Sequence, residues 1–264
     1  MPRLLVPAKA DASGLLHDIT PESAGWTYVG FSTRKLAAGG AADVDTGAKE
    51  VCLVVLSGKV RVTAPDFDTG LIGERADVFS GLPWSVYLPP GTSAKVAAEG
   101  EAEIALCSAP ATGKLPARVI PPQAVETLTR GKGANLRHIR NILPETAEAE
   151  SLLVVEVITP AGHWSSYPPH KHDQDDLPRE SLLEETYYHR INPPQGFAMQ
   201  RVYTDDRSLD ETMAVSDRDV VLVPRGYHPC AAAHGYELYY LNVMAGPKRV
   251  WRFHNDPAHE WLIG

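Results

Sequence analysis

The chain has 264 residues, of which 44% are hydrophobic and 22% are charged, and its formal net charge is −8. An acidic chain without a dense basic run is a poor candidate for nucleic-acid binding. No apolar stretch reaches the roughly 18–20 residues that a membrane helix needs, and the first residues do not resemble a secretory signal. We therefore expect neither a nucleic-acid partner nor a membrane partner.

Glycine (21) and proline (22) are abundant and occur along the whole chain, which favours many short strands with tight turns over long helices. The three cysteines, Cys52, Cys107 and Cys230, cannot all pair with one another. Two of them lie in apolar, strand-like runs, where a buried free thiol is the expected state. Free thiols are typical of a reducing compartment, so we expect a cytoplasmic protein.

The first half of the chain consists of short strand-like segments. An apolar run at 51–56 is followed by alternating residues at 59–63, and further segments lie at 85–88 and 102–106. Strands of this length, separated by turn signals every 8–12 residues or so, predict a sandwich or barrel.

The chain changes character after the first set of strands. Residues 109–116 are typical of a connector, and the prolines at 121 and 122 favour a short helix through Leu128. We therefore place a boundary at Leu115, between an N-terminal half (1–115) and a C-terminal half (116–264).

The second half repeats the strand pattern, with segments at 152–158, 184–190, 197–203, 219–224 and 237–244. Each half also contains a strand that runs into a turn with proline and glycine, at 88–91 and at 223–226. This parallel indicates two copies of one β fold.

One group of residues in the second half carries metal chemistry. His170 and His172 are two positions apart, so on a strand both imidazoles lie on the same face. Glu185 and His228 complete a set of three histidines and one glutamate. Such a set suits Zn²⁺, Fe²⁺, Mn²⁺, Co²⁺ or Ni²⁺ with open positions for a substrate. An isolated His-x-His pair is common in exposed loops, but the order of all four residues favours a metal site.

The order of these residues resembles the cupin superfamily, whose small barrels hold a metal with two motifs. Residues 168–172 and 185–187 match the first motif, and 224–228 match the second. The spacer between His172 and Glu185 is longer than in the family, which indicates an insertion and leaves Glu184 as an alternative ligand. We prefer Glu185.

The first half resembles a second cupin without a metal. Glu50 and the strand-like run to Gly58 resemble the first motif, but no histidine lies between His17 and His138. We therefore expect the first half to have a structural role.

Longer runs resemble one family in particular, the 5-deoxy-glucuronate isomerases. The matching segments are 162–173, 184–197, 223–229, 239–247 and 251–261. The resemblance implies an all-β bicupin, with two jelly-roll barrels and few short helices, that acts in bacterial myo-inositol catabolism. It implies the aldose–ketose isomerisation of 5-deoxy-D-glucuronate to 5-dehydro-2-deoxy-D-gluconate. It also implies a divalent metal, with zinc as the first choice, on His170, His172, Glu185 and His228.

Such an isomerase needs a proton-transfer group near the metal. Tyr187 shares strand parity with Glu185 and is therefore the catalytic candidate, although the same position suits a core tyrosine. The residues do not identify the general base.

The substrate of such an isomerase also carries a carboxylate, which calls for arginine or a set of N–H donors. Arg201 lies in an apolar, strand-like run and is the first candidate, and an outward ion pair with Asp205 or Asp206 is the alternative. Arg225, in the turn of the second motif, and His163 are further substrate-binding candidates.

Three other functions stay open. A cupin dioxygenase is possible, because the same ligands suit Fe²⁺ and oxygen chemistry. An isomerase of a related keto-uronate would need the same groups. A non-catalytic sugar-binding cupin has less support, because no helix-turn-helix or basic segment accompanies the barrel. The barrel edges and the metal-free half lead us to expect a homo-oligomer that acts on a small sugar acid.

Overall fold

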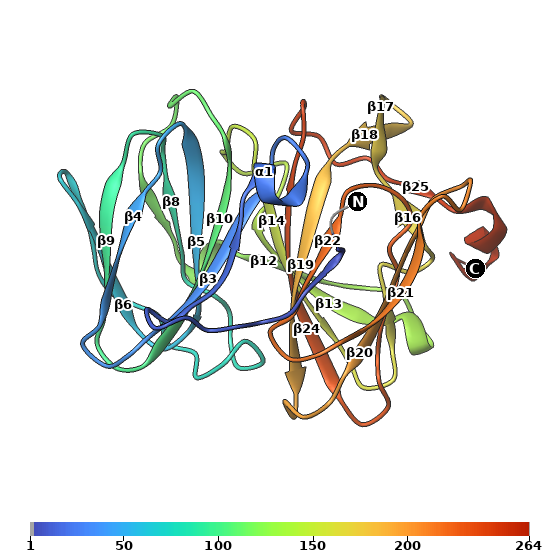
Figure 1. Cartoon of the computed structure of the whole chain (residues 1–264), viewed down its shortest axis with the longest axis horizontal. Coiled ribbons are helices and arrows are strands. Elements are labelled where there is room, and N and C mark those ends of the chain that lie inside the picture. Colours follow the sequence, from blue (N-terminus) through green and yellow to red (C-terminus); the bar gives the residue numbers. More distant parts are fainter. Residues whose placement is uncertain (1–2, 264) are drawn as a thin grey trace.

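The computed structural model describes residues 3–263, which form two β-sandwiches side by side (Figure 1). The helices are short: α1 (Pro21–Ala24) and the 3₁₀ segments η1 (Pro122–Ala124), η2 (Gly133–Asn135) and η3 (Pro257–Ile263). The prediction of an all-β fold with few short helices is confirmed. The helix expected through Leu128 is wrong beyond residue 124, where the chain enters a strand. In the described part of the chain, every helix is too short or too polar to cross a membrane.

The N-terminal half consists of a six-stranded and a four-stranded sheet. The larger sheet has the order β11 (Arg118–Ile120), β8 (Ser85–Leu88), β5 (Lys49–Ser57), β10 (Ala102–Pro110), β3 (Gly30–Leu36) and β2 (Leu15–Ile19). The smaller sheet has the order β4 (Ala41–Asp45), β9 (Ser93–Ala98), β6 (Val60–Ala64) and β7 (Phe67–Ile72).

The C-terminal half repeats this plan. Its larger sheet has the order β1 (Leu5–Val6), β22 (Val220–Val223), β19 (Glu184–Asn192), β24 (Glu237–Ala245), β14 (Leu153–Thr159), β13 (Arg137–Leu143) and β12 (Glu126–Arg130). Its smaller sheet has the order β15 (Trp164–Ser165), β23 (Cys230–Ala232), β20 (Ala198–Tyr203) and β21 (Asp210–Val215). Two ribbons complete it: β16 (His170–Lys171) with β25 (His254–Asn255), and β17 (Asp173–Asp176) with β18 (Glu180–Leu182).

Each half gives one edge strand to the large sheet of the other half. β1, at the start of the N-terminal half, pairs with β22, whereas β11, at the start of the C-terminal half, pairs with β8. The two positions are equivalent, because β22 and β8 both lie next to the strand that carries the first motif or its counterpart. Strand pairing therefore crosses the proposed boundary at residue 115 in both directions, and the division into 1–115 and 116–264 stays a prediction.

The two large sheets pack against each other and share one apolar core. Phe31 and Val54 from the N-terminal half belong to the same buried cluster as Tyr188 and Leu241 from the C-terminal half. Each sandwich also has its own interior between its large and small sheets. Both faces of the large sheets are therefore buried, as the nearly continuous apolar runs of β5 and β14 require.

Two glutamates connect the halves in a reciprocal way. Glu184, at the start of β19, accepts backbone N–H bonds of 2.6, 2.6 and 3.0 Å from residues 27, 28 and 29. Glu50, at the start of β5, accepts bonds of 2.9, 2.6 and 2.6 Å from residues 150, 151 and 152. In each case the donors immediately precede a strand of the opposite sheet, β3 or β14. Each carboxylate therefore satisfies backbone donors that would otherwise be lost at the interface.

We expect Glu184→Gln to lower the free energy of unfolding by about 2 kcal/mol, because charge-assisted hydrogen bonds to backbone donors are replaced by weaker neutral ones. Urea unfolding measures this loss. The control is Glu211→Gln on the exposed face of β21, which should change stability by less than about 0.5 kcal/mol. Equal losses in the two variants would contradict the role assigned to Glu184.

Candidate metal centre

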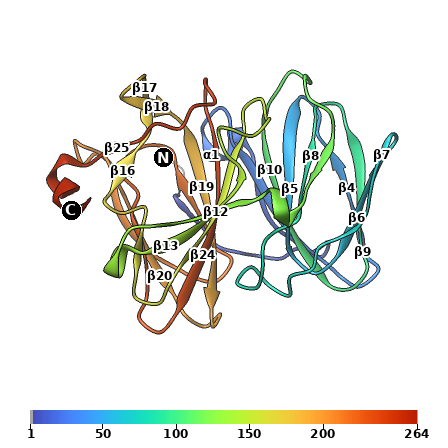
Figure 2. The same cartoon turned by 180° about the vertical axis from the view of Figure 1, so that it is seen from behind.

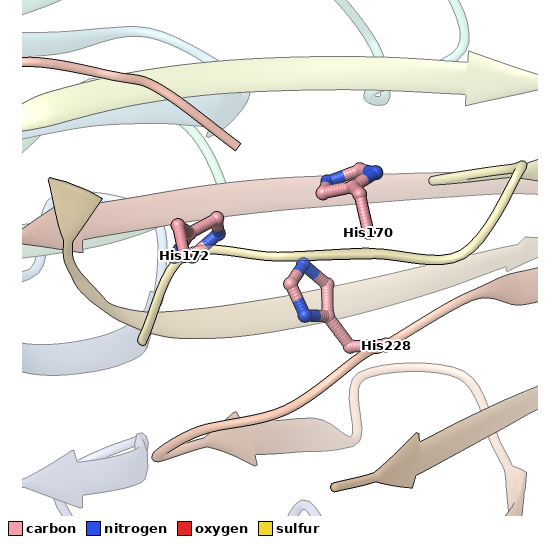
Figure 3. A group of neighbouring side chains, drawn as sticks. All are labelled: His170, His172 and His228. Carbon is pink, nitrogen blue, oxygen red and sulfur yellow. The ribbon is translucent and has the colours of Figure 1, made fainter. Parts of the chain in front are cut away.

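Three histidines from two separate segments converge inside the C-terminal sandwich (Figure 3). His170 begins β16, His172 follows it, and His228 lies in the turn between β22 and β23. One ligand nitrogen from each ring lies within 4.8 Å of those of the other two. The structure thus brings together the three imidazoles that the two motifs predicted, at a spacing that one ion can bridge.

Backbone carbonyls orient two of these rings. His172 Nδ1 lies 3.0 Å from the carbonyl oxygen of Leu183, and His228 Nδ1 lies 2.8 Å from that of Gly226. Because a carbonyl can only accept, both Nδ1 atoms donate, and the Nε2 lone pairs are left for a metal. His228 Nε2 is buried and has no hydrogen-bond partner among the described residues. A buried nitrogen that no hydrogen bond occupies, close to two other imidazoles and 3.2 Å from Glu185 Oε2, fits a metal ligand.

Glu185 lies directly beside these nitrogen atoms. Its Oε2 atom is 3.1 Å from His172 Nε2 and 3.2 Å from His228 Nε2. Burial acting alone would raise the pKa of this carboxyl, but the two imidazoles lower it to about 2. Glu185 is therefore ionised at neutral pH, as a metal ligand must be. Glu184 points to the opposite face of β19 and binds the N-terminal half.

A buried charge network connects the two ligand-bearing segments. Lys171 Nζ lies 2.8 Å from Asp173 and 3.4 Å from Glu180, on the side of its strand away from the metal ligands. Asp173 also accepts a bond of 2.8 Å from the backbone N–H of Gly226. The residues inserted between His172 and Glu185 thus form an ordered hairpin, β17–β18, whose base is tied to the His228 turn.

The C-terminal tail packs against His170, the third histidine of the group. β25 pairs with β16, so that Asn255 lies opposite His170, and the Phe253 ring centroid is 4.7 Å from the His170 ring. Burial, and then the neighbouring His228 and His172, hold the pKa of His170 well below its usual value. His170 is thus neutral at neutral pH, the form in which imidazole ligates metals.

A cavity of about 400 Å³ opens onto His170 and Glu185, two of the four candidate ligands. The β12–β13 hairpin, β14, β19, β24 and the C-terminal tail form its walls, and Figure 2 shows the hairpin on the rear of the C-terminal half. The polar and aromatic side chains that line it are Arg130, Lys132, Asn135, Arg137, Ser166, Tyr167, His170, Glu185, Tyr187, Tyr240, Asn242, Trp251, Phe253 and Asn255. Glu185 is the one carboxylate among the described lining residues.

Tyr187 lies in this wall, two residues beyond Glu185 on the same face of β19. Its hydroxyl is 2.8 Å from Ser166 Oγ. Ser166 is buried and has a φ of 51°, a left-handed conformation that costs energy in a residue other than glycine. Burial, and then the charge of Glu185, hold the Tyr187 pKa well above its usual value, so the phenol keeps its proton at neutral pH.

The predicted substrate-binding residues lie outside the cavity lining. Arg201 pairs with Asp210 at 2.7 Å, and it shares the outward face of β20 with Met199 while Gln200 points inward. This corrects the expectation for Arg201, because strand alternation directs its side chain away from the site. Arg225 is exposed in its turn. His163 Nδ1 contacts the carbonyl oxygen of Leu136 at 3.0 Å.

The sequence reasoning missed the basic residues that do line the cavity, Arg130, Lys132 and Arg137. They lie beyond the connector predicted at 109–116 and the helix predicted through Leu128, in a stretch for which the sequence predicted no strand. Residues 137–143 do not alternate strictly between polar and apolar side chains, and the glycines at 131 and 133 interrupt the segment before them, so the sequence carries only a weak strand signal here.

The whole chain is similar to known proteins. Residues 4–262 match the model of the KduI/IolB family. The 5-deoxy-glucuronate isomerase of Geobacillus kaustophilus is 55% identical over 265 residues, which cover 100% of this chain and 96% of that protein. The enzyme of the same name from Geobacillus thermodenitrificans is 57% identical over 246 residues, with coverages of 93% and 90%.

Solved structures agree with this likeness. An IolB-like protein from Salmonella typhimurium LT2 has a TM-score of 0.97 and 53% identity, and the match covers 99% of this chain and 100% of that one. Bacillus subtilis oxalate decarboxylase has a TM-score of 0.64 at 13% identity, with coverages of 97% and 80%. The second likeness concerns the fold alone, and it confirms the bicupin architecture.

We expect His172→Ala to lower the affinity for Zn²⁺ by at least about 100-fold, because loss of a ligand exceeds the 10–100-fold cost of losing a residue that only supports one. Competition with a chelating dye measures the affinity. His234→Ala removes an exposed imidazole of the same half and should bind Zn²⁺ as the unmodified protein does. Zinc binding that survives His172→Ala unchanged would place the metal elsewhere.

Proposed function

The chain belongs to the KduI/IolB family, and we propose that it isomerises 5-deoxy-D-glucuronate to 5-dehydro-2-deoxy-D-gluconate at the centre formed by His170, His172, Glu185 and His228. One observation carries this proposal. A cavity lined by Glu185, His170 and Tyr187 occurs in a chain that is 55% identical, over its whole length, to a 5-deoxy-glucuronate isomerase. The non-catalytic sugar-binding alternative loses support for the same reason.

The reaction moves hydrogen between two adjacent carbons. An aldose loses the proton on C2 and gains one on C1, so that the carbonyl moves from C1 to C2. When bound, a divalent ion, with zinc as the first choice and Mn²⁺, Fe²⁺, Co²⁺ or Ni²⁺ as alternatives, supplies a Lewis acid that polarises the sugar carbonyl. The imidazoles of His170, His172 and His228 and the carboxylate of Glu185 are the donor set that would hold it, because a metal binds the deprotonated nitrogen of each ring.

Tyr187 is suited to handle a proton at the sugar oxygens. Its phenol is protonated at neutral pH, faces the cavity beside Glu185, and is fixed by Ser166 Oγ at 2.8 Å. It can therefore donate a hydrogen bond or a proton to an oxygen on which negative charge develops. Ser166 can accept from Tyr187 or donate to it, which offers a route to replace the proton.

A cytoplasmic, homo-oligomeric enzyme of myo-inositol catabolism completes the proposal. The buried, free state of all three cysteines supports a reducing compartment. Trp164 on β15 and Met199 on β20 are 40% and 38% exposed and lie on either side of Ala231 in the intervening strand β23, which supports an apolar contact with another subunit.

The direct test is an assay with 5-deoxy-D-glucuronate of metal-stripped, zinc-restored and His172→Ala protein. We expect turnover that disappears on stripping, returns with a divalent metal, and is absent from the variant. Ketose formation, followed by NMR, is the measurement. A protein that binds metal and consumes oxygen, but leaves this sugar unchanged, would be a dioxygenase. Turnover of a related keto-uronate alone would keep the isomerase and change its substrate.

For Tyr187→Phe we expect kcat to fall by about 100-fold or more while metal affinity is retained, because the variant lacks only the hydroxyl. Steady-state kinetics on the zinc-loaded enzyme give kcat. Tyr236→Phe is the matched control, since Tyr236 is half-buried at the edge of the same apolar core and is not part of the cavity lining. If Tyr187→Phe turns over at the normal rate, Tyr187 is a packing residue.

A further inference from the structure

Two arginines lie side by side on the cavity wall. Arg130 on β12 is directly opposite Arg137 on β13, so both side chains belong to the same face of the sheet, and both line the cavity. Lys132, in the connecting turn, is a third cation of the same lining. Like charges directly opposite each other in a sheet repel and are destabilising. A bound anion would reduce this repulsion.

The protein itself supplies no such anion within residues 3–263. Arg137 Nη1 donates 3.1 Å to the carbonyl oxygen of Asn135, and no described carboxylate pairs with Arg130, Lys132 or Arg137. Other arginines of the same half are paired: Arg140 with Glu156, and Arg190 with Asp217. Arg225 and Arg249 also have no carboxylate partner, but Arg225 lies in an exposed turn and Arg249 donates to backbone carbonyls. The three cavity cations differ from these two in lying together in the lining of one cavity, where they are free to bind an anion from outside the chain.

The turn between the two strands is built closely around Arg137. Gly131 has a φ of +76°, and a Cβ atom there would lie 2.1 Å from the carbonyl oxygen of Asn135 and 2.9 Å from Arg137 Nη1. Only glycine allows this backbone to close on the guanidinium. The turn therefore fixes the Arg137 side chain, which lowers the entropy lost when it binds a ligand.

The hairpin has no full counterpart in the metal-free half. β2 occupies the position of β13 at the edge of the N-terminal sheet, and nothing in the described chain corresponds there to β12. Metal ligands and the basic hairpin thus occur together in one half of the molecule. Asn242 Nδ2 and Trp251 Nε1, both buried without a partner among the described residues, also line the cavity and are free to donate to sugar oxygens.

We infer that Arg137, supported by Arg130, binds the carboxylate of the sugar acid while its carbonyl end lies at the metal centre. This inference rests on the proposed function. A planar guanidinium forms two parallel hydrogen bonds to a carboxylate, and such a contact positions the substrate as well as attracting it. Arg137 is thus a specificity-determining residue: it distinguishes a sugar acid from the neutral sugar of the same length.

The test compares 5-deoxy-D-glucuronate with 5-deoxy-D-glucose, in which a hydroxymethyl group replaces the carboxylate. For the acid, Arg137→Gln should lower kcat/KM by about 100-fold, chiefly through KM, and Arg137→Lys by about 10-fold, because lysine keeps the charge but not the paired donors. For the neutral sugar, neither variant should change kcat/KM by more than about threefold. Arg61→Gln, on an exposed strand of the N-terminal half, controls for net charge.

Calorimetric binding of D-glucuronate to the metal-loaded protein gives a readout that does not depend on turnover. If 5-deoxy-D-glucuronate is not a substrate but D-glucuronate binding weakens about 100-fold in Arg137→Gln, the proposed function fails and the carboxylate site stands. If the acid is turned over, but Arg137→Gln and Arg137→Lys lower kcat/KM equally for the acid and for the neutral sugar, the inference is overturned. Circular dichroism and zinc content confirm that the variants are folded.

Discussion

The site depends on one strand, β19, that is buried on both faces. One face of β19 belongs to the interface between the halves, where Glu184 binds backbone donors and Tyr188 packs into the shared core. The other face belongs to the interior of the C-terminal sandwich and carries Glu185 and Tyr187. Because successive residues of a strand alternate between its faces, the interface also fixes the register of the chemistry. A slip by one residue would exchange Glu184 with Glu185.

In the N-terminal half, β5 occupies the position of β19 but carries no candidate metal ligand. Glu50 occupies the position of Glu184 and makes the equivalent bonds across the interface. The next interior positions of β5, Val51 and Leu53, are apolar and belong to a packed core. The reciprocal carboxylate is therefore present in both halves, whereas the candidate metal ligand Glu185 and the tyrosine Tyr187 are present in one. This pattern is expected if the interface is a requirement of the fold and the metal centre an addition to one copy.

The sequence predicted that His170, His172 and His228 come together because local features place them. The His-x-His pair and the second-motif turn can each be recognised from a few consecutive residues. The structure places Glu185 beside His172 and Glu184 at the interface with the N-terminal half. Parity could not place Arg201, because an apolar run with one arginine does not reveal which face of the strand is the interior. The structure shows that this arginine shares its face with exposed residues and pairs with Asp210.

The features that the sequence could not predict depend on distant parts of the chain. β1, near the N-terminus, pairs with β22 in the large sheet of the C-terminal half, and no local pattern indicates that pairing. The cavity wall is likewise assembled from the β12–β13 hairpin and the C-terminal tail, which lie on either side of the metal motifs in the sequence. The sequence could not identify Arg137 because only the folded sheet brings it into the lining of the same cavity as Glu185 and Tyr187.

The charge network beside the candidate metal ligands explains how the His170–His172 segment and the His228 turn keep a fixed position relative to each other. Burial disfavours the Lys171 ammonium, but Asp173, Glu180 and Asp205 more than compensate, so the pKa of Lys171 is raised. Buried charges of this kind contribute little net stability, because desolvation offsets most of their attraction. Here these charges fix the positions of the two segments that carry the histidines. Asp173 contacts Lys171, between the two first-motif histidines, and the Gly226 N–H, two residues before His228. An apolar replacement could fill the same volume, but it could not hold the imidazoles in one fixed relation.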